Sequence, residues 1–112
     1  MTDWNTYREH LSQNVKVLAK LSPNTLKGLQ TLETPEPTHK HLDAKTRELI
    51  SLAVAVTTRC DGCIAVHTVG AKKAGASKEE IAEALGVAVA LNAGAALVYS
   101  SRALDAFDSV KD

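Results

Sequence analysis

The scarcity of large side chains is the feature of this 112-residue sequence that most limits its fold. Aromatic residues make up only 4% of the chain, whereas alanine occurs 17 times. A core built from Ala, Val and Leu reaches native packing density only where backbones approach closely. Closely packed helices satisfy this condition better than a sheet. The sequence therefore predicts an all-α protein, and its length predicts a single domain over residues 1–112.

The first part of the chain carries the spacing and end signals of two helices. Residues 4–21 place apolar side chains at steps of three and four, which draws one stripe along a helix. Asp3 or Thr2 is the expected cap of this helix. Pro23 ends it, because the residue before a proline is pushed out of the helical region. Pro23 also suits the first turn of a short second helix that reaches Leu32.

A proline-rich loop separates these helices from the rest. Two prolines within residues 34–38 exclude a helix there. Asp43 then caps an expected helix over residues 44–57. Its apolar segment 49–56 would also fit a buried strand, but the charged residues 45–48 lead into it without a turn signal, which favours the helix.

The last part of the chain predicts three more helices. Gly75 ends the first of them. Ser77 and Glu80 have the spacing of a capping box at the start of the second. The expected ranges are 61–74, 78–91 and 92–110. The expected fold is therefore a compact bundle of about six helices.

Residues 84–99 form the most apolar segment, with Asn92 as the one strongly polar residue in it. A spanning helix needs about 20 predominantly apolar residues, so this segment is too short and no membrane is expected. An all-round apolar helix must still be covered, and a chain of this length has little interior. The expected cover is another copy of the chain, which makes the protein a homo-oligomer.

The charge balance excludes some partners. Thirteen basic residues stand against thirteen acidic ones, so no basic field exists to hold nucleic acid. The polar start of the chain lacks the pattern of a signal peptide, which predicts a cytoplasmic protein. A structural disulfide is not expected in that reducing compartment, so the two cysteines need a different role.

Cys60, Cys63 and His67 form the most informative group. The cysteines lie three residues apart at the start of a predicted helix, a spacing that allows a reversible disulfide. The helix N-terminus stabilises a thiolate, which is the reactive form of the side chain. His67 follows Cys63 by one turn on the same face, where it can relay a proton near neutral pH. Glu48, at the start of an apolar run in the preceding helix, is a hypothetical partner for proton transfer.

The same two cysteines would also suit a metal site or an inert core. Zinc would take Cys60, Cys63 and His67 with a fourth ligand from Glu48 or another histidine, but no second ligand pair completes a structural zinc site. A haem attachment site needs histidine directly after the second cysteine, where Ile64 stands. Two inert core thiols are the simplest alternative. The remaining histidines, all in polar or loop sequence, are expected to be solvated: His10, His39 and His41.

Taken together, Glu48, Cys60-x-x-Cys63 and His67 resemble the motif of the AhpD-like alkylhydroperoxidase family, within the carboxymuconolactone decarboxylase superfamily. The resemblance covers roughly residues 40–105 and includes the lead-in 42–50. It implies an all-helical fold that assembles as trimers or hexamers.

The resemblance also implies an activity, that of a thiol-dependent peroxidase or disulfide reductase. Cys63 would attack the peroxide, Cys60 would resolve the product as a disulfide, and Glu48 and His67 would form the proton relay. No bound cofactor or metal is implied beyond the redox-active disulfide. The implied partners are a hydroperoxide or small disulfide and an external dithiol reductant, with a lipoyl-type dithiol as one option. Gly62 departs from the pattern, because well-studied members carry histidine there.

Two further functions remain as alternatives. One is a carboxymuconolactone decarboxylase-like enzyme, although such members generally lack the cysteine pair. The second is a non-enzymatic thiol sensor or metal-binding scaffold, which would use the same cysteines without turnover.

Overall fold

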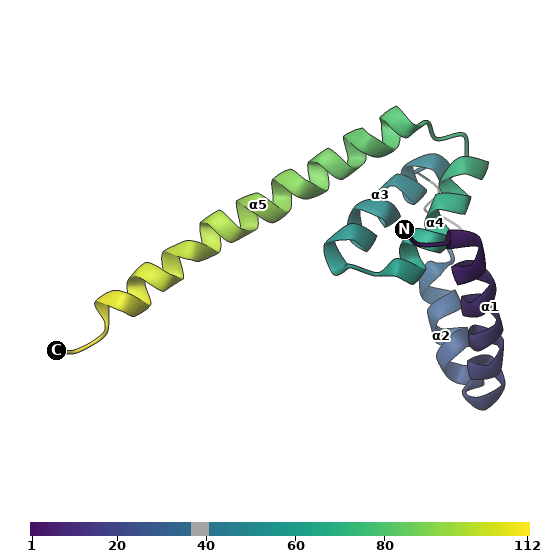
Figure 1. Ribbon diagram of the computed structural model, residues 1–112, viewed down its shortest axis with the longest axis horizontal. Coiled ribbons are helices and arrows are strands. Elements are labelled where there is room, and N and C mark those ends of the chain that lie inside the picture. The colour runs from purple at the N-terminus through teal and green to yellow at the C-terminus, as the bar shows by residue number, and fades with distance from the viewer. Residues whose placement is uncertain (37–40) are drawn as a thin grey trace.

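Figure 1 shows the computed structural model, which describes residues 1–36 and 41–112 and folds them into helices without a strand. The five helices are α1 (Trp4–Leu21), α2 (Pro23–Glu33), α3 (Ala44–Thr58), α4 (Asp61–Lys73) and α5 (Lys78–Asp108). The predicted all-α class is confirmed, and residues 49–56 belong to a helix rather than a strand. The expectations for residues 37 and 38 of the loop and for His39 concern positions outside the described part.

Local hydrogen bonds that the sequence predicts define the ends of the helices. Asp3 caps α1 and Asp43 caps α3, each accepting from the amide three residues further on, at 3.1 Å and 2.8 Å. Ser77 and Glu80 form the expected capping box at the start of α5. Gly75 follows α4 with a φ of +86°, a conformation that glycine adopts without steric cost.

Helix α5 is one continuous helix of 31 residues. The expected division into helices 78–91 and 92–110 is therefore wrong, and the described chain has five helices rather than six. Asn92 does not act as an N-cap, because its side-chain amide donates to the carbonyl of Ala88 within the helix and to Oγ1 of Thr57 on α3. No proline or exposed turn signal interrupts the ladder there.

The helices pack in a chain of neighbours. Helix α3 contacts both α4 and α5, and α1 contacts α2 and α4. Figure 1 shows α1 and α2 side by side at one end, with α3 and α4 next to them. The buried apolar side chains lie on α3, α4 and α5, and all but one are alanines: Leu52, Ala55, Ala65, Ala71 and Ala88. The core is therefore small and depends on close backbone approach, as the composition predicted.

The single chain is not compact. Its radius of gyration is 18.8 Å, whereas a compact chain of this length would have about 13 Å. The cause is α5, whose C-terminal half extends away from the other helices (Figure 1). Large apolar side chains on this half are 69–77% exposed: Leu97, Val98, Tyr99, Leu104 and Phe107. Tyr99 is thus exposed in the single chain.

The length of α5 also changes the membrane argument. Among the described residues, α5 is the one helix whose length and composition would allow it to cross a membrane. Of the residues in its most apolar segment, 6% are buried. Residues 84–99 are themselves shorter than a span, but the helix continues on both sides of them, so its length alone does not exclude one. Part of the apolar segment nevertheless packs on α3, where Ala88 is 7% exposed and Asn92 bonds to Thr57.

Candidate functional site

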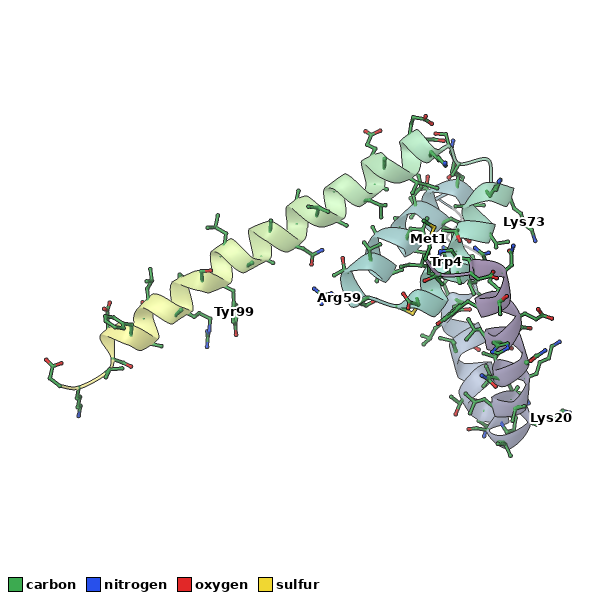
Figure 2. All side chains as sticks on the ribbon, in the orientation of Figure 1. Met1, Trp4, Lys20, Arg59, Lys73 and Tyr99 are labelled. Atoms are coloured by element: carbon green, nitrogen blue, oxygen red, sulfur yellow. A yellow bond between two sulfur atoms is a disulfide. The ribbon has the colours of Figure 1, made fainter. Side chains whose placement is uncertain are left out.

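The cysteine pair lies at the joint between α3 and α4. Arg59 follows α3 with φ 55° and ψ 48°, a left-handed conformation that turns the chain sharply. Cys60 then takes the N-cap position of α4 and Cys63 lies in its first turn. Figure 2 labels Arg59 at this joint. The strained turn therefore places both cysteines at the positive end of α4.

The two sulfurs are joined as a disulfide. Cys60 and Cys63 have Cα atoms 5.2 Å apart, which is within the ordinary range for a disulfide. Sγ of Cys60 also accepts a hydrogen bond from the backbone amide of Cys63, at 3.1 Å. Both residues are half-buried, so a small reagent can reach them. After reduction, the same amide can stabilise a thiolate on Cys60.

Glu48 and His67 meet between α3 and α4. Oε2 of Glu48 lies 2.8 Å from Nδ1 of His67, and the two side chains are 26% and 29% exposed. With Glu48 as a carboxylate, Nδ1 carries the hydrogen and donates it, which leaves Nε2 as the free acceptor of the ring. His67 follows Cys63 by one turn, about 6 Å of helix rise. The structure thus brings together the acid and the histidine that periodicity alone could not pair.

Gly70 makes room for the Glu48 carboxylate. A Cβ at residue 70 would lie 2.6–2.7 Å from the carboxyl atoms of Glu48, a distance that real Cβ atoms do not tolerate. Glycine is costly inside a helix, so its presence three residues after His67 has a structural reason. Sequence reasoning missed this residue. The signal in the sequence was a glycine in the interior of a predicted helix, one turn after His67.

Helix α1 lies against the other side of α4. Nε of Arg8 donates to the carbonyl of Ala65 at 2.7 Å, and Nη2 donates to Oγ1 of Thr68 at 3.0 Å. Both contacts are partly buried. A Cβ on Gly62, between the two cysteines, would lie 3.3 Å from Cδ2 of Leu11 on α1. Sequence reasoning missed this docking, because residues almost 60 positions apart share no local pattern.

A pocket of about 510 Å³ opens beside the acid–base pair. It combines aliphatic side chains with one guanidinium and the Glu48–His67 pair, and neither cysteine lines it. Its lining residues are Leu32, Glu33, Leu42, Arg47, Glu48, Ile50, Ser51 and His67. The pocket therefore places an organic molecule, if one binds there, next to the Glu48–His67 hydrogen bond.

Within the described ranges 1–36 and 41–112, no three His, Cys, Asp or Glu side chains gather closely enough to hold a metal ion. His10 and His41 are exposed.

Comparison with known proteins gives concordant matches. The sequence profile described as the carboxymuconolactone decarboxylase family matches residues 23–106. An uncharacterized protein of Haemophilus influenzae is 51% identical over 110 residues, which covers 98% of this chain and 97% of that protein. Uncharacterized protein 4 in the cox locus of Paracoccus denitrificans is 44% identical over 69 residues, 62% of each chain.

A solved structure is similar as well. The crystal structure of the apo form of a carboxymuconolactone decarboxylase family protein from Legionella pneumophila superimposes with a TM-score of 0.73. The two sequences are 33% identical, and the match covers 94% of each chain. The similarity therefore extends over nearly all of the helical architecture.

Proposed function

The chain belongs to the carboxymuconolactone decarboxylase family, and within that family we propose that it is an oxidoreductase that cycles Cys60 and Cys63 between dithiol and disulfide. The substrate would be an organic hydroperoxide or a small disulfide. One observation carries the proposal: the cysteine pair starts α4, and a histidine one turn further is bonded to a half-buried carboxylate at 2.8 Å. Thiol chemistry needs both a reactive thiolate and a group that moves protons.

The peroxidase half-reaction would use the two sulfurs in turn. The Cys63 thiolate attacks the distal oxygen of the hydroperoxide, so that an S–O bond forms, the O–O bond breaks and the alcohol leaves after taking a proton. Cys63 is then a sulfenic acid. The sulfur of Cys60 displaces water from it and the disulfide forms. An external dithiol restores the two thiols and is itself oxidised.

The observed hydrogen bond at Cys60 suits the step in which the disulfide is reduced. A dithiol that attacks Sγ of Cys63 expels Cys60 as the leaving thiolate. The backbone amide of Cys63, which bonds to Sγ of Cys60 at 3.1 Å, would stabilise the charge on that leaving group. Nε2 of His67 would take the thiol proton and return it to the leaving alcohol, while Glu48 holds the ring in the required tautomer.

The direct test is a thiol count and an intact mass before and after one equivalent of an organic hydroperoxide. The reduced protein should lose both of its thiols and two hydrogens of mass, and a dithiol should restore them. Cys63→Ser should abolish turnover, whereas Cys60→Ser should accumulate a sulfenic acid that a dimedone-type reagent traps. Full activity in both variants would refute the assignment. Two unchanged thiols in the wild type would instead favour a decarboxylase or a scaffold.

We also propose that a second copy covers the exposed half of α5, within a trimer or hexamer in the cytoplasm. A lipid bilayer would have to replace the packing of Ala88 and the Asn92–Thr57 bond on the same helix, whereas another protein chain leaves both in place. Light scattering should give a mass of several chains. Leu97→Glu should lower that mass, and a monomeric wild type would contradict the proposal.

A further inference from the structure

The tyrosine Tyr7 is placed next to the thiol pair. Its hydroxyl lies 3.8 Å from the position that a Cβ of Gly62 would occupy, and Gly62 stands between Cys60 and Cys63. The phenol therefore reaches α4 at the turn that carries both sulfurs. Since Gly62 has no side chain, no side-chain atom of that residue stands between the phenol and the start of the helix.

Several contacts fix the position of this side chain. The ring of Trp4 packs edge-on against the ring of Tyr7, with centroids 5.7 Å apart. The next residue, Arg8, bonds to the carbonyl of Ala65 and to Thr68 on α4. Helix α1 is thus anchored to α4 at the turn that carries Tyr7, which keeps the phenol beside the start of α4.

The hydroxyl of Tyr7 can donate one hydrogen. Tyr7 is half-buried and also lines a hollow of about 420 Å³ along α1. A half-buried phenol beside the turn of the two cysteines can donate this hydrogen to a thiolate that forms on reduction, when the disulfide becomes two thiols.

We propose that Tyr7 is a positioning residue of the thiol pair, whose hydroxyl donates a hydrogen bond to the thiolate of the reduced protein. This inference rests on the cysteines being redox-active, as in the proposed function, but not on any particular oxidant. A hydrogen bond to the charged form of a group favours that form, so the phenol lowers the pKa of the thiol that it contacts.

The test is the ultraviolet titration of thiolate absorbance in the reduced protein, with Tyr7→Phe compared with Tyr99→Phe. Tyr99 lies far out on α5 and serves as the matched control (Figure 2). Tyr7→Phe should lower the acid dissociation constant of one thiol about tenfold, because a hydrogen bond to a charged group is lost. Tyr99→Phe should leave it unchanged. Repeating the titration with Cys60→Ser and Cys63→Ser identifies the sulfur.

A second measurement uses the unaltered protein. The ¹³C resonance of the Tyr7 ring carbon that bears the hydroxyl should shift on reduction of the disulfide, whereas that of Tyr99 should not. An unchanged thiol titration in a folded Tyr7→Phe variant would overturn the proposal, as would an unchanged Tyr7 resonance. Neither readout uses a hydroperoxide. A protein without peroxidase turnover could therefore still pass both, which separates this inference from the proposed activity.

Discussion

Oε2 of Glu48 on α3 lies 2.8 Å from Nδ1 of His67 on α4, and this bond joins the two helices beside the cysteine pair. This bond gives the two ring nitrogens of His67 different roles. Nδ1 is engaged by the carboxylate, so Nε2 is the nitrogen left for proton transfer. The bond is thus both a helix contact and the arrangement on which the proposed proton relay depends.

Replacement of Glu48 should weaken turnover without removing the thiols. Glu48→Gln keeps the shape of the side chain but removes the negative charge that holds the Nδ1–H tautomer. General acid–base groups contribute about 10²–10⁴-fold to rate, so we expect at least a roughly 100-fold loss in kcat/KM with a hydroperoxide. Glu83→Gln, an exposed change on α5, is the control. Equal rates for the two variants would exclude a role for the carboxylate.

A methyl group at Gly70 should displace the Glu48 carboxylate. The added Cβ would lie 2.6–2.7 Å from the end of this flexible side chain, so the carboxylate must move away from His67, and the variant should gain less stability than an unhindered Gly→Ala change in a helix. Gly28→Ala on α2 is a matched control, because a Cβ there meets nothing within 4 Å. That change should stabilise the protein by about 0.5–1 kcal/mol. Urea unfolding measures both, and a gain for Gly70→Ala as large as that for Gly28→Ala would contradict the observed packing.

Loss of the Arg8 guanidinium should release α1 from α4. Arg8→Met retains the apolar stem but removes the donors to Ala65 and Thr68. Hydrogen bonds from charged groups contribute about 1.5–3 kcal/mol, so the free energy of unfolding should fall by about this amount. Hydrogen exchange should become faster in α1 first. Lys16→Met, an exposed change on the same helix, should alter neither quantity.

Replacement of Arg59, whose backbone is left-handed, by glycine should stabilise the protein. A non-glycine residue in this conformation costs about 1–2 kcal/mol. Glycine removes this cost, but it also loses more conformational freedom on folding, which offsets part of the gain. Arg59→Gly should therefore raise the free energy of unfolding by about 0.5–1 kcal/mol. Thermal unfolding measures the change, and Arg102→Gly within α5 should have the opposite sign. A lower Tm for Arg59→Gly would show that the arginine side chain makes a larger contribution.

The ion pair between Lys45 and Glu80 should give stability a defined pH window. Nζ of Lys45 lies 2.8 Å from Oε2 of Glu80, which ties the start of α3 to the start of α5. The hydrogen bond with Glu80 raises the pKa of Lys45 above 10.5, and the same bond lowers the pKa of Glu80 below 4.5.

The signs of these two shifts define that window. The raised pKa of Lys45 gives a contribution that is lost as pH rises through the folded value. The lowered pKa of Glu80 gives one that is lost as pH falls through its folded value. Lys45→Met should therefore destabilise the protein at pH 7 but have less effect below about pH 4. An effect of equal size at both values would mean that the pair contributes by packing and not by charge.

The sequence by itself predicted the all-helical class, most helix ends and the position of the cysteine pair at the start of one helix. Capping residues such as Asp43 and Ser77 act within three residues, so their effect is local and visible in the chain. The spacing of Cys60, Cys63 and His67 lies within two turns of one helix, and helix geometry fixes which side chains share a face. The sequence did not reveal the role of Asn92, because its partner, Thr57, lies 35 residues away.

The tertiary structure decided which distant residues meet at that pair. The Glu48–His67 bond, the room at Gly70 and the docking of Tyr7 and Arg8 join segments that no periodicity connects. They depend on how α1, α3 and α4 pack, and packing is set by the whole surface of each helix rather than by local pattern. The same reason explains α5: its sequence shows that it must be covered, and only the packed fold shows which half α3 covers.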